Sequence, residues 1–263
     1  MTKGKERFRK FISDFYLVII LIFLYAPIFT MMVLSFNQSK SRTHWGGFTL
    51  RWYTLMFESR AIMYALYTTL LVAMISALVA TVIGTVTAIA ISHMKPVSKN
   101  IFMSISNIPM LNADIVTGIA LMLAFIAFGI SLGFKTVLIS HITFNIPYVI
   151  LSVMPKLKQT DRSTYEAALD LGASPAYAFF EVVFPDIMPG VLSGFLLAFT
   201  MSLDDFIITH FTKGAGINTL STLIYSEVRR GIRPSMYALS TVIFVVVLVV
   251  LLIANFRKQP EKD

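Results

Sequence analysis

Six long stretches with almost no charge dominate this sequence. They cover residues 15–34, 61–92, 101–132, 136–154, 187–203 and 235–256, and Asp114 is the only charged residue among them. A helix that crosses a bilayer needs about 20 apolar residues. Because the runs are continuously apolar rather than alternating, they indicate helices and exclude a membrane β-barrel. The sequence therefore predicts an all-α integral membrane protein with six transmembrane helices.

The composition excludes the other broad classes of protein. Hydrophobic residues make up 56% of the chain and charged residues 14%, whereas a soluble domain carries roughly 25% charged residues. Disordered chains and coiled coils need more polarity still. The absence of cysteine excludes disulfides, thiolate metal sites and cysteine nucleophiles.

A single transmembrane domain over residues 1–263 accommodates all six spans. We expect the spans at about 15–34, 63–92, 101–132, 136–154, 187–211 and 235–256, and a cytoplasmic polar segment at 155–186. The first stretch is long for a signal peptide, and Ser35-Phe36-Asn37 makes a poor cleavage site. We therefore expect it to be a retained helix.

The distribution of lysine and arginine predicts the orientation. With the N-terminus inside, the inner segments 1–14, 93–100, 155–186 and 257–263 carry thirteen of these residues, and the outer segments carry nine. This bias favours an orientation with both termini in the cytoplasm. We expect the protein to lie in the cell membrane. The net charge of +8 then reflects topology and attraction to anionic lipids, and no basic stripe with interleaved aromatic residues points to nucleic acid.

The cytoplasmic segment 155–186 begins with the pattern of a short helix. Ser163 followed by Glu166 fits a capping box at the N-terminus of a helix. Gly172 is placed to end that helix, as glycine does at the first position beyond a helix C-terminus.

A second short helix should follow at once. Ser174 is a favoured N-cap, and Pro175 suits the first helical position. Pro185 and Pro189 are expected to close this helix and lead into the fifth span. So small a helix pair cannot bury a core of its own. It lies on the membrane face of its own protein or docks into a groove on a partner, and the residues alone leave both alternatives open.

Three carboxylates, Asp114, Asp204 and Asp205, lie inside or at the end of apolar stretches. A charged residue at mid-membrane costs at least about 2.5–3.5 kcal/mol and usually lines a cavity or pathway. Counted along continuous helices, Asp114 and Asp204 both lie about 20 Å from the inner face. Acids at one depth would attract a cation. The structural alternatives are a helix cap for Asp204 and Asp205 and a hydrogen bond to a neighbouring helix for Asp114.

Aromatic side chains could complete such a site, because their faces attract cations and cover methylene groups. The candidates are Trp45, Phe144, Tyr148, Phe206 and Tyr225. For Trp45 the competing interpretation is an interfacial aromatic belt over the outer loop 35–60.

The cytoplasmic segment closely resembles the EAA motif of ABC-importer permeases. Glu166-Ala167-Ala168, Gly172, Val182, Phe184 and Pro185 match the spacing of that motif. Val182 and Phe184 replace isoleucine and leucine, which are mild departures. The resemblance implies that a coupling segment docks on a cytoplasmic ATPase through Glu166, Ala167, Ala168, Asp170, Gly172 and Pro185. It also implies that ATP and Mg²⁺ bind to that partner, with no cofactor on this chain, and the sequence contains no phosphate-binding loop.

Other stretches look like the spermidine/putrescine permease family. They are Trp45–Thr49 with Trp52-Tyr53, Ser140–Phe144 and Phe199–Phe206. The resemblance implies the MetI-like permease fold and a non-enzymatic subunit that pairs with a second permease. The pair would be served by two ATPase subunits and an extracytoplasmic polyamine-binding protein. It places Asp114, Asp204, Asp205, Ser202 and Trp45 along the substrate pathway.

Three other functions compete with a polyamine permease. A permease of the same family could carry a metal ion, a phosphonate or an opine. A stand-alone channel or ion-coupled carrier would be expected to show inverted repeats, which the sequence does not display, and it would not need a docking segment. A membrane enzyme would require an assembled catalytic constellation, and none is recognisable.

Overall fold

The computed structural model describes residues 3–257 and the side chains within residues 15–161 and 163–249. The predicted domain 1–263 and the predicted inner segment 257–263 extend beyond these limits. Regular structure in the described residues is helical, apart from one isolated bridge between Asn37 and Phe48. This agrees with an all-α fold.

The chain forms two compact units, and the first comprises residues 1–63 and 226–263 as far as they are described. Its helices are α1 (Lys3–Ser35), α2 (Arg51–Glu58) and α12 (Pro234–Arg257). Within this unit α12 contacts both α1 and α2.

The loop between α1 and α2 is held by one buried residue, Asn37. Its side chain donates to the carbonyl of His44 at 2.8 Å and accepts from the amide of Gly46 at 2.8 Å. Its own carbonyl accepts from the indole of Trp52 at 2.7 Å. The loop therefore has a fixed backbone, and it presents Trp45 with half of its surface exposed.

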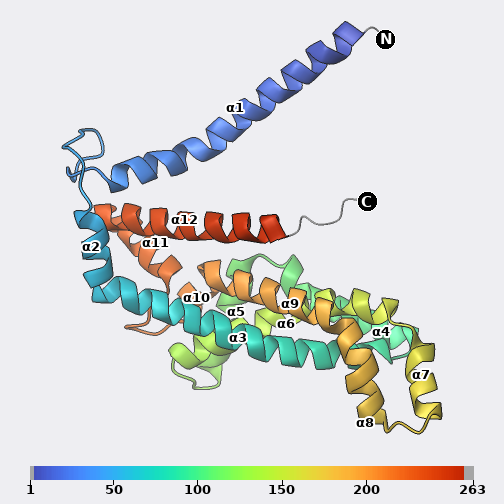
Figure 1. Cartoon of the computed structure of the whole chain (residues 1–263). Helices are drawn as coiled ribbons and strands as arrows, with labels where there is room; N and C mark the ends of the chain where they lie inside the picture. The colour runs from blue at the N-terminus through green and yellow to red at the C-terminus, as the bar shows by residue number, and fades with distance from the viewer. Residues whose placement is uncertain (1–2, 258–263) are drawn as a thin grey trace. The chain divides into compact units, whose positions relative to one another are not determined.

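The second unit comprises residues 64–225. Its helices are α3 (Arg60–Ser92), α4 (Pro96–Leu111), α5 (Asp114–Ala127), α6 (Phe134–Gln159), α7 (Arg162–Asp170), α8 (Pro175–Ala178), the π-helical η1 (Phe179–Val183), α9 (Phe184–Asp204), α10 (Ile207–Thr212) and α11 (Leu220–Arg230). Helix α3 begins, and helix α11 ends, in residues that belong to the first unit. Helices α6 and α9 lie side by side (Figure 1).

Small and branched apolar side chains from α3, α6 and α9 form the core of this unit. The buried members are Ala77, Ala88, Ile91, Val149, Ile150, Val153, Met154, Ile187 and Ala198. Between helices in lipid, close van der Waals packing replaces the hydrophobic drive that water provides, so small residues are favoured at the contacts.

Three glycines allow these helices to approach closely. A Cβ at Gly84 would lie 2.7 Å from the Cβ of Val149, and one at Gly190 would lie 3.0 Å from the carbonyl oxygen of Ser152. One at Gly194 would lie 3.3 Å from the Cα of Val149. Gly190 and Gly194 therefore form a GxxxG surface through which α9 packs on α6 of the same chain.

The described residues contain four helices that are long and apolar enough to cross a membrane. These helices cover residues 15–35, 60–92, 134–159 and 175–204. A fifth span exists if α4 and α5, which are bent by 102° at their junction, count as one. Where the sixth span was predicted, α12 runs over Pro234–Arg257, and Pro234–Val249, the part of it whose side chains are described, is apolar.

Two predicted spans are not continuous helices. The span 101–132 is broken between α4 and α5, where Asn112 and Ala113 have extended backbone conformations. Pro109, in the last turn of α4, cannot donate an intrahelical hydrogen bond there. The span 187–211 is interrupted after Asp204, and its N-terminal part begins earlier than predicted.

We expect Gly84→Ala to destabilise the second unit, because the added methyl group overlaps Val149. Overpacking of this kind costs about 1–3 kcal/mol, and the thermal unfolding midpoint of the purified full chain in detergent measures it. Gly133→Ala is the matched control, because the nearest atom to its new Cβ, Ile217 Cδ1, is 4.0 Å away. Equal unfolding midpoints of Gly84→Ala and Gly133→Ala would contradict this packing.

Candidate functional site

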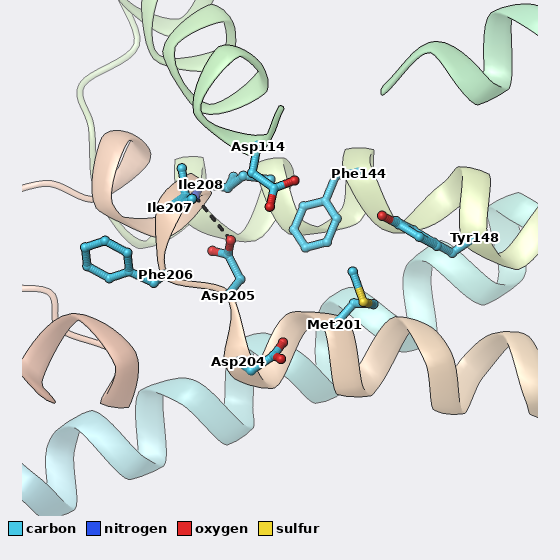
Figure 2. A pocket seen from close by; sticks show the side chains of 9 residues that line it. All are labelled: Asp114, Phe144, Tyr148, Met201, Asp204, Asp205, Phe206, Ile207 and Ile208. Carbon is cyan, nitrogen blue, oxygen red and sulfur yellow. Dashed lines mark hydrogen bonds between the residues drawn. The ribbon is translucent and has the colours of Figure 1, made fainter. Parts of the chain in front are cut away.

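A pocket of about 340 Å³ lies within the second unit, where α5, α6, α9 and α10 meet. Figure 2 shows the residues that line it, Asp114, Phe144, Tyr148, Met201, Asp204, Asp205, Phe206, Ile207 and Ile208. The structure therefore brings all three intramembrane carboxylates of the sequence to one place. They meet at two helix breaks, rather than along the straight helices from which their common depth was calculated.

The carboxylate of Asp205 is engaged in holding the start of α10. Its Oδ1 accepts from the amide of Ile208 at 3.2 Å, the bond drawn in Figure 2. Its Oδ2 accepts from the amide and the hydroxyl of Thr209 at 2.8 and 2.7 Å. The first amides of a helix have no partner within the helix, and Asp205 supplies one. The helix-cap alternative thus describes Asp205.

Asp204 is in the opposite electrostatic situation. It is the last residue of α9, its side chain is exposed toward the pocket, and no other described residue hydrogen-bonds to its carboxylate or forms an ion pair with it. The C-terminus of a helix carries a partial negative charge. The helix end and the carboxylate therefore act together to attract a cation.

Asp114 lies between these two extremes. It is the first residue of α5 and exposed, and its carboxylate has no hydrogen-bond partner among the residues that the structure describes. The partial positive charge at a helix N-terminus stabilises an acid there. That charge offsets part of the negative potential that Asp114 contributes to the pocket.

Aromatic rings form the walls beside these acids. Phe144 and Tyr148 lie one turn apart on α6, and both line the pocket. Phe206 packs against Tyr225 with ring centroids 4.5 Å apart. These faces can cover methylene groups and attract ammonium groups. Of the aromatic candidates in the sequence, three line the pocket and Tyr225 supports one of them.

Two residues that the sequence assigns to the pathway do not line this pocket. Ser202 is buried and does not line the pocket, and it is hydrogen-bonded to Ser76 at 3.0 Å and to His141 at 2.5 Å. Trp45 belongs to the loop of the first unit. The sequence reasoning missed the central place of His141. A buried histidine in an otherwise charge-free span needs partners, and that need was the available signal.

The predicted coupling segment begins with a different cap from the one expected. Asp161, not Ser163, is the N-cap of α7, and its carboxylate accepts from the amide of Ser163 at 2.9 Å. This hydrogen bond holds the pKa of Asp161 below its usual value. The predicted capping box of Ser163 and Glu166 is therefore wrong, because the preceding aspartate reaches the free amide first. Glu166, Ala167 and Asp170 lie exposed on α7, and Ala168 is half-buried.

Gly172 ends α7 as predicted. Its φ is +89°, a region that other residues enter only with strain. Its amide donates to the carbonyl of Leu169 at 2.9 Å, and the amide of Ala173 donates to the carbonyl of Ala168 at 3.1 Å. This pair of bonds is a Schellman motif.

The second helix starts as predicted but does not stop at the prolines. Ser174 caps α8 by accepting from the amide of Tyr177 at 3.3 Å, and Pro175 is the first helical residue. From there one helix of 30 residues continues to Asp204. The wide π turn η1, in which the amide of Phe184 bonds to Phe179, immediately precedes Pro185. A π turn relaxes the usual hydrogen-bond register, so exposed Pro185 is accommodated without ending the helix.

Apolar side chains project from the predicted coupling segment. Leu171, beside the Gly172 turn, is 90% exposed, and Tyr177 and Phe180 are more than half exposed. Exposed apolar side chains that lie together often mark a surface that contacts another molecule.

The chain matches one protein family over residues 80–257, described as binding-protein-dependent transport system inner membrane component. It is 38% identical over 266 residues to the putrescine transport system permease protein PotI of Escherichia coli strain K12, with 95% of each chain covered. It is 37% identical over 237 residues to the spermidine/putrescine transport system permease protein PotC of the same strain, with 90% of each chain covered.

Solved structures of ABC transporters share the fold. A bacterial alginate ABC transporter, crystallised with an alginate pentasaccharide-bound periplasmic protein, aligns with a TM-score of 0.73 at 18% identity, covering 98% of this chain and 96% of that chain. The MetNI methionine ABC transporter in an inward-facing conformation aligns with a TM-score of 0.59, covering 76% of this chain and 96% of that one. These likenesses establish the MetI-like fold.

We expect Asp205→Asn to lower thermal stability and Asp204→Asn to leave it nearly unchanged. Asp205→Asn removes the charge of a carboxylate that accepts hydrogen bonds from amides in the first turn of α10, and losing a charged cap interaction costs about 1–2 kcal/mol. The two substitutions make the same chemical change at adjacent residues, so each serves as the control for the other. Equal unfolding midpoints of the two full-length variants would contradict the assignment of Asp205 as the cap.

Proposed function

Because the chain belongs to the family of binding-protein-dependent transport system inner membrane components, we propose that it is the permease subunit of an ABC importer that moves polyamines into the cell. The names of its relatives PotI and PotC support the solute. The observation within the structure that carries the proposal is the pocket of acids and aromatic rings, whose chemistry fits an organic cation.

The pocket is suited to a flexible polycation rather than to a compact one. Asp114 and Asp204 come from different helices and offer two separate carboxylates. Phe144, Tyr148 and Phe206 offer aromatic faces between and beside them. A polyamine alternates ammonium groups with methylene segments, so its ends match the acids and its stem matches the rings.

The pocket should bind the solute only transiently. A transporter must release what it carries, and a buried carboxylate that paired fully with a cation would retain it. Asp205 already accepts from the start of α10, which leaves two carboxylates for the solute. Extracytoplasmic capture then falls to a separate polyamine-binding protein, and Trp45, in the outer loop, lies along the same pathway in this proposal.

The remaining parts of the importer are separate chains. A second permease subunit completes a heterodimeric pore in the inner membrane, and two ATPase subunits bind ATP and Mg²⁺ on the cytoplasmic side. This chain hydrolyses no ATP, and both of its termini are cytoplasmic. The exposed turn at Leu171 and Gly172 supports docking on the ATPase, and Glu166, Ala167, Ala168, Asp170 and Pro185 belong to the same segment.

We expect Asp204→Asn to reduce polyamine uptake by the assembled transporter about tenfold. One charge interacting with an ammonium group near a protein surface contributes a few kcal/mol, and a loss of 1.4 kcal/mol corresponds to a factor of ten. Asp114→Asn should reduce uptake less, because the N-terminus of α5 already offsets its charge. Uptake of radiolabelled putrescine and spermidine into proteoliposomes measures both effects.

Glu58→Gln is the matched control for these variants, because Glu58 is an exposed acid that also ends its helix, α2. Its uptake should equal that of the natural protein. Wild-type uptake by a correctly assembled Asp114→Asn/Asp204→Asn double variant would overturn the proposed role of the pocket.

Leu171→Asp should uncouple ATP hydrolysis from transport, because it places a charge where an apolar contact is expected. Leu171→Met keeps the apolar surface and should behave normally. Gly172→Pro should uncouple as well, since proline cannot adopt a φ of +89°. The readout is ATP turnover stimulated by loaded binding protein, together with uptake. Normal stimulation in both Leu171→Asp and Gly172→Pro would contradict docking through this turn.

A further inference from the structure

A buried chain of hydrogen bonds lies behind the pocket and is centred on His141 of α6, which is 1% exposed. Its Nδ1 is 2.5 Å from the hydroxyl of Ser202 on α9. Its Nε2 is 2.9 Å from the hydroxyl of Thr209 on α10 and 3.4 Å from Oδ2 of Asp205. One imidazole ring therefore contacts both sides of the break between α9 and α10.

Counting hydrogens fixes the direction of these bonds. The single hydroxyl hydrogen of Thr209 is donated to Asp205, so Thr209 can only accept from His141, and Nε2 carries a hydrogen. At the other ring nitrogen, Nδ1 is hydrogen-bonded to Ser202 on α9. Ser202 is in turn hydrogen-bonded to Ser76 on α3 at 3.0 Å, and the hydroxyl of Ser76 also donates to the carbonyl of Ala73 at 3.3 Å. Every polar side chain of this buried network therefore has a partner, as such a network requires.

We propose that His141 is a positioning residue for the cation pocket: by donating to Thr209 and bonding to Ser202, it ties together α10 and α9, which meet at Asp204 and Asp205. This inference rests on the proposed cation-binding role of the pocket. Only Asp205 and Phe206 separate α9 from α10, and Asp204 is the last residue of α9. The direction of its carboxylate therefore depends on how firmly α10 is tied to α6.

Among the described residues, the charged group that faces the ring directly is Asp205, at Nε2. Asp114 and Asp204 line the pocket together with Phe144, whose ring centroid is 5.2 Å from that of the imidazole. The neighbours from α3, α9 and α10 are the hydroxyls of Ser76, Ser202 and Thr209. His141 itself does not line the pocket, so it acts through Thr209 and Asp205 rather than by touching the solute.

Glutamine and asparagine separate the two halves of this role. Glutamine can place an amide nitrogen where Nε2 lies and so keep the donor to Thr209. Asparagine reaches only the position of Nδ1 and keeps a contact to Ser202 alone. His93→Gln and His93→Asn are matched controls, because His93 is an exposed histidine that directly follows the last residue of α3, Ser92.

The natural absence of cysteine provides a direct readout of the pocket. Met201→Cys places a single thiol in the lining. In membranes that contain the assembled transporter, its reaction rates with a trimethylammonium thiosulfonate and with a neutral methyl thiosulfonate are compared. The ratio of the two rates reports the local attraction for a cation, independently of transport. The protein that carries Met201→Cys alone is the parent with which all further variants are compared.

We expect His141→Asn to lower this ratio at least threefold, toward the value of Asp204→Asn, and His141→Gln to stay within twofold of the parent. The thermal unfolding midpoint of each variant accompanies the rates, so that a ratio is compared only among folded proteins. Equal losses in His141→Gln and His141→Asn would overturn the donor role of Nε2.

Two further outcomes distinguish this inference from the proposed function. If Asp204→Asn lowers the ratio and His141→Asn does not, the positioning role is overturned and the pocket stands. If neither substitution changes the ratio, the cation-attracting role of the pocket is overturned, and the positioning role fails with it.

Discussion

A helix that ends within a membrane protein exposes amide and carbonyl groups that water cannot reach, and the acidic pocket is built around two such ends. The break between α9 and α10 is tolerable because the carboxylate of Asp205 accepts from two amides of the next turn. The break before α5 places Asp114 in the first turn of its helix. Satisfying the backbone thus accounts for Asp205, and the partial positive charge of a helix N-terminus stabilises Asp114, before any solute is considered.

The same constraint grades the acids as sites for a cation. A carboxylate that caps a helix shares its charge with amides, whereas one at a helix C-terminus adds to a partial charge of the same sign. Asp204 has the second arrangement, Asp205 the first, and Asp114 is intermediate. Equal residue types at neighbouring positions therefore differ in electrostatic environment because of the helix ends on which they lie.

The sequence predicted the apolar helices, the acids, three aromatic linings and the turn at Gly172, because each is encoded by local composition or by a single backbone requirement. It did not predict the break after Asp204. No proline or glycine marks that break, which depends on how far the side chain of Asp205 reaches. The place of His141 was also beyond local reasoning, since Ser202 and Thr209 follow it by 61 and 68 residues. The predicted capping box was wrong because Asp161 is a competing acceptor. The helix end predicted at Pro185 was wrong because the π turn accommodates the proline within the helix.

The uninterrupted helix from Pro175 to Asp204 has a thermodynamic consequence. It is about 45 Å long, and the exposed apolar turn at Leu171 and Gly172 precedes its N-terminal end, whereas the least neutralised acid, Asp204, is its last residue. If engaging one end alters the free energy of occupying the other, linkage requires the converse by the same factor. A cation in the pocket then changes the affinity for the ATPase as much as the ATPase changes the affinity for the cation. The energy of hydrolysis is useful only to the extent that this shared term is large.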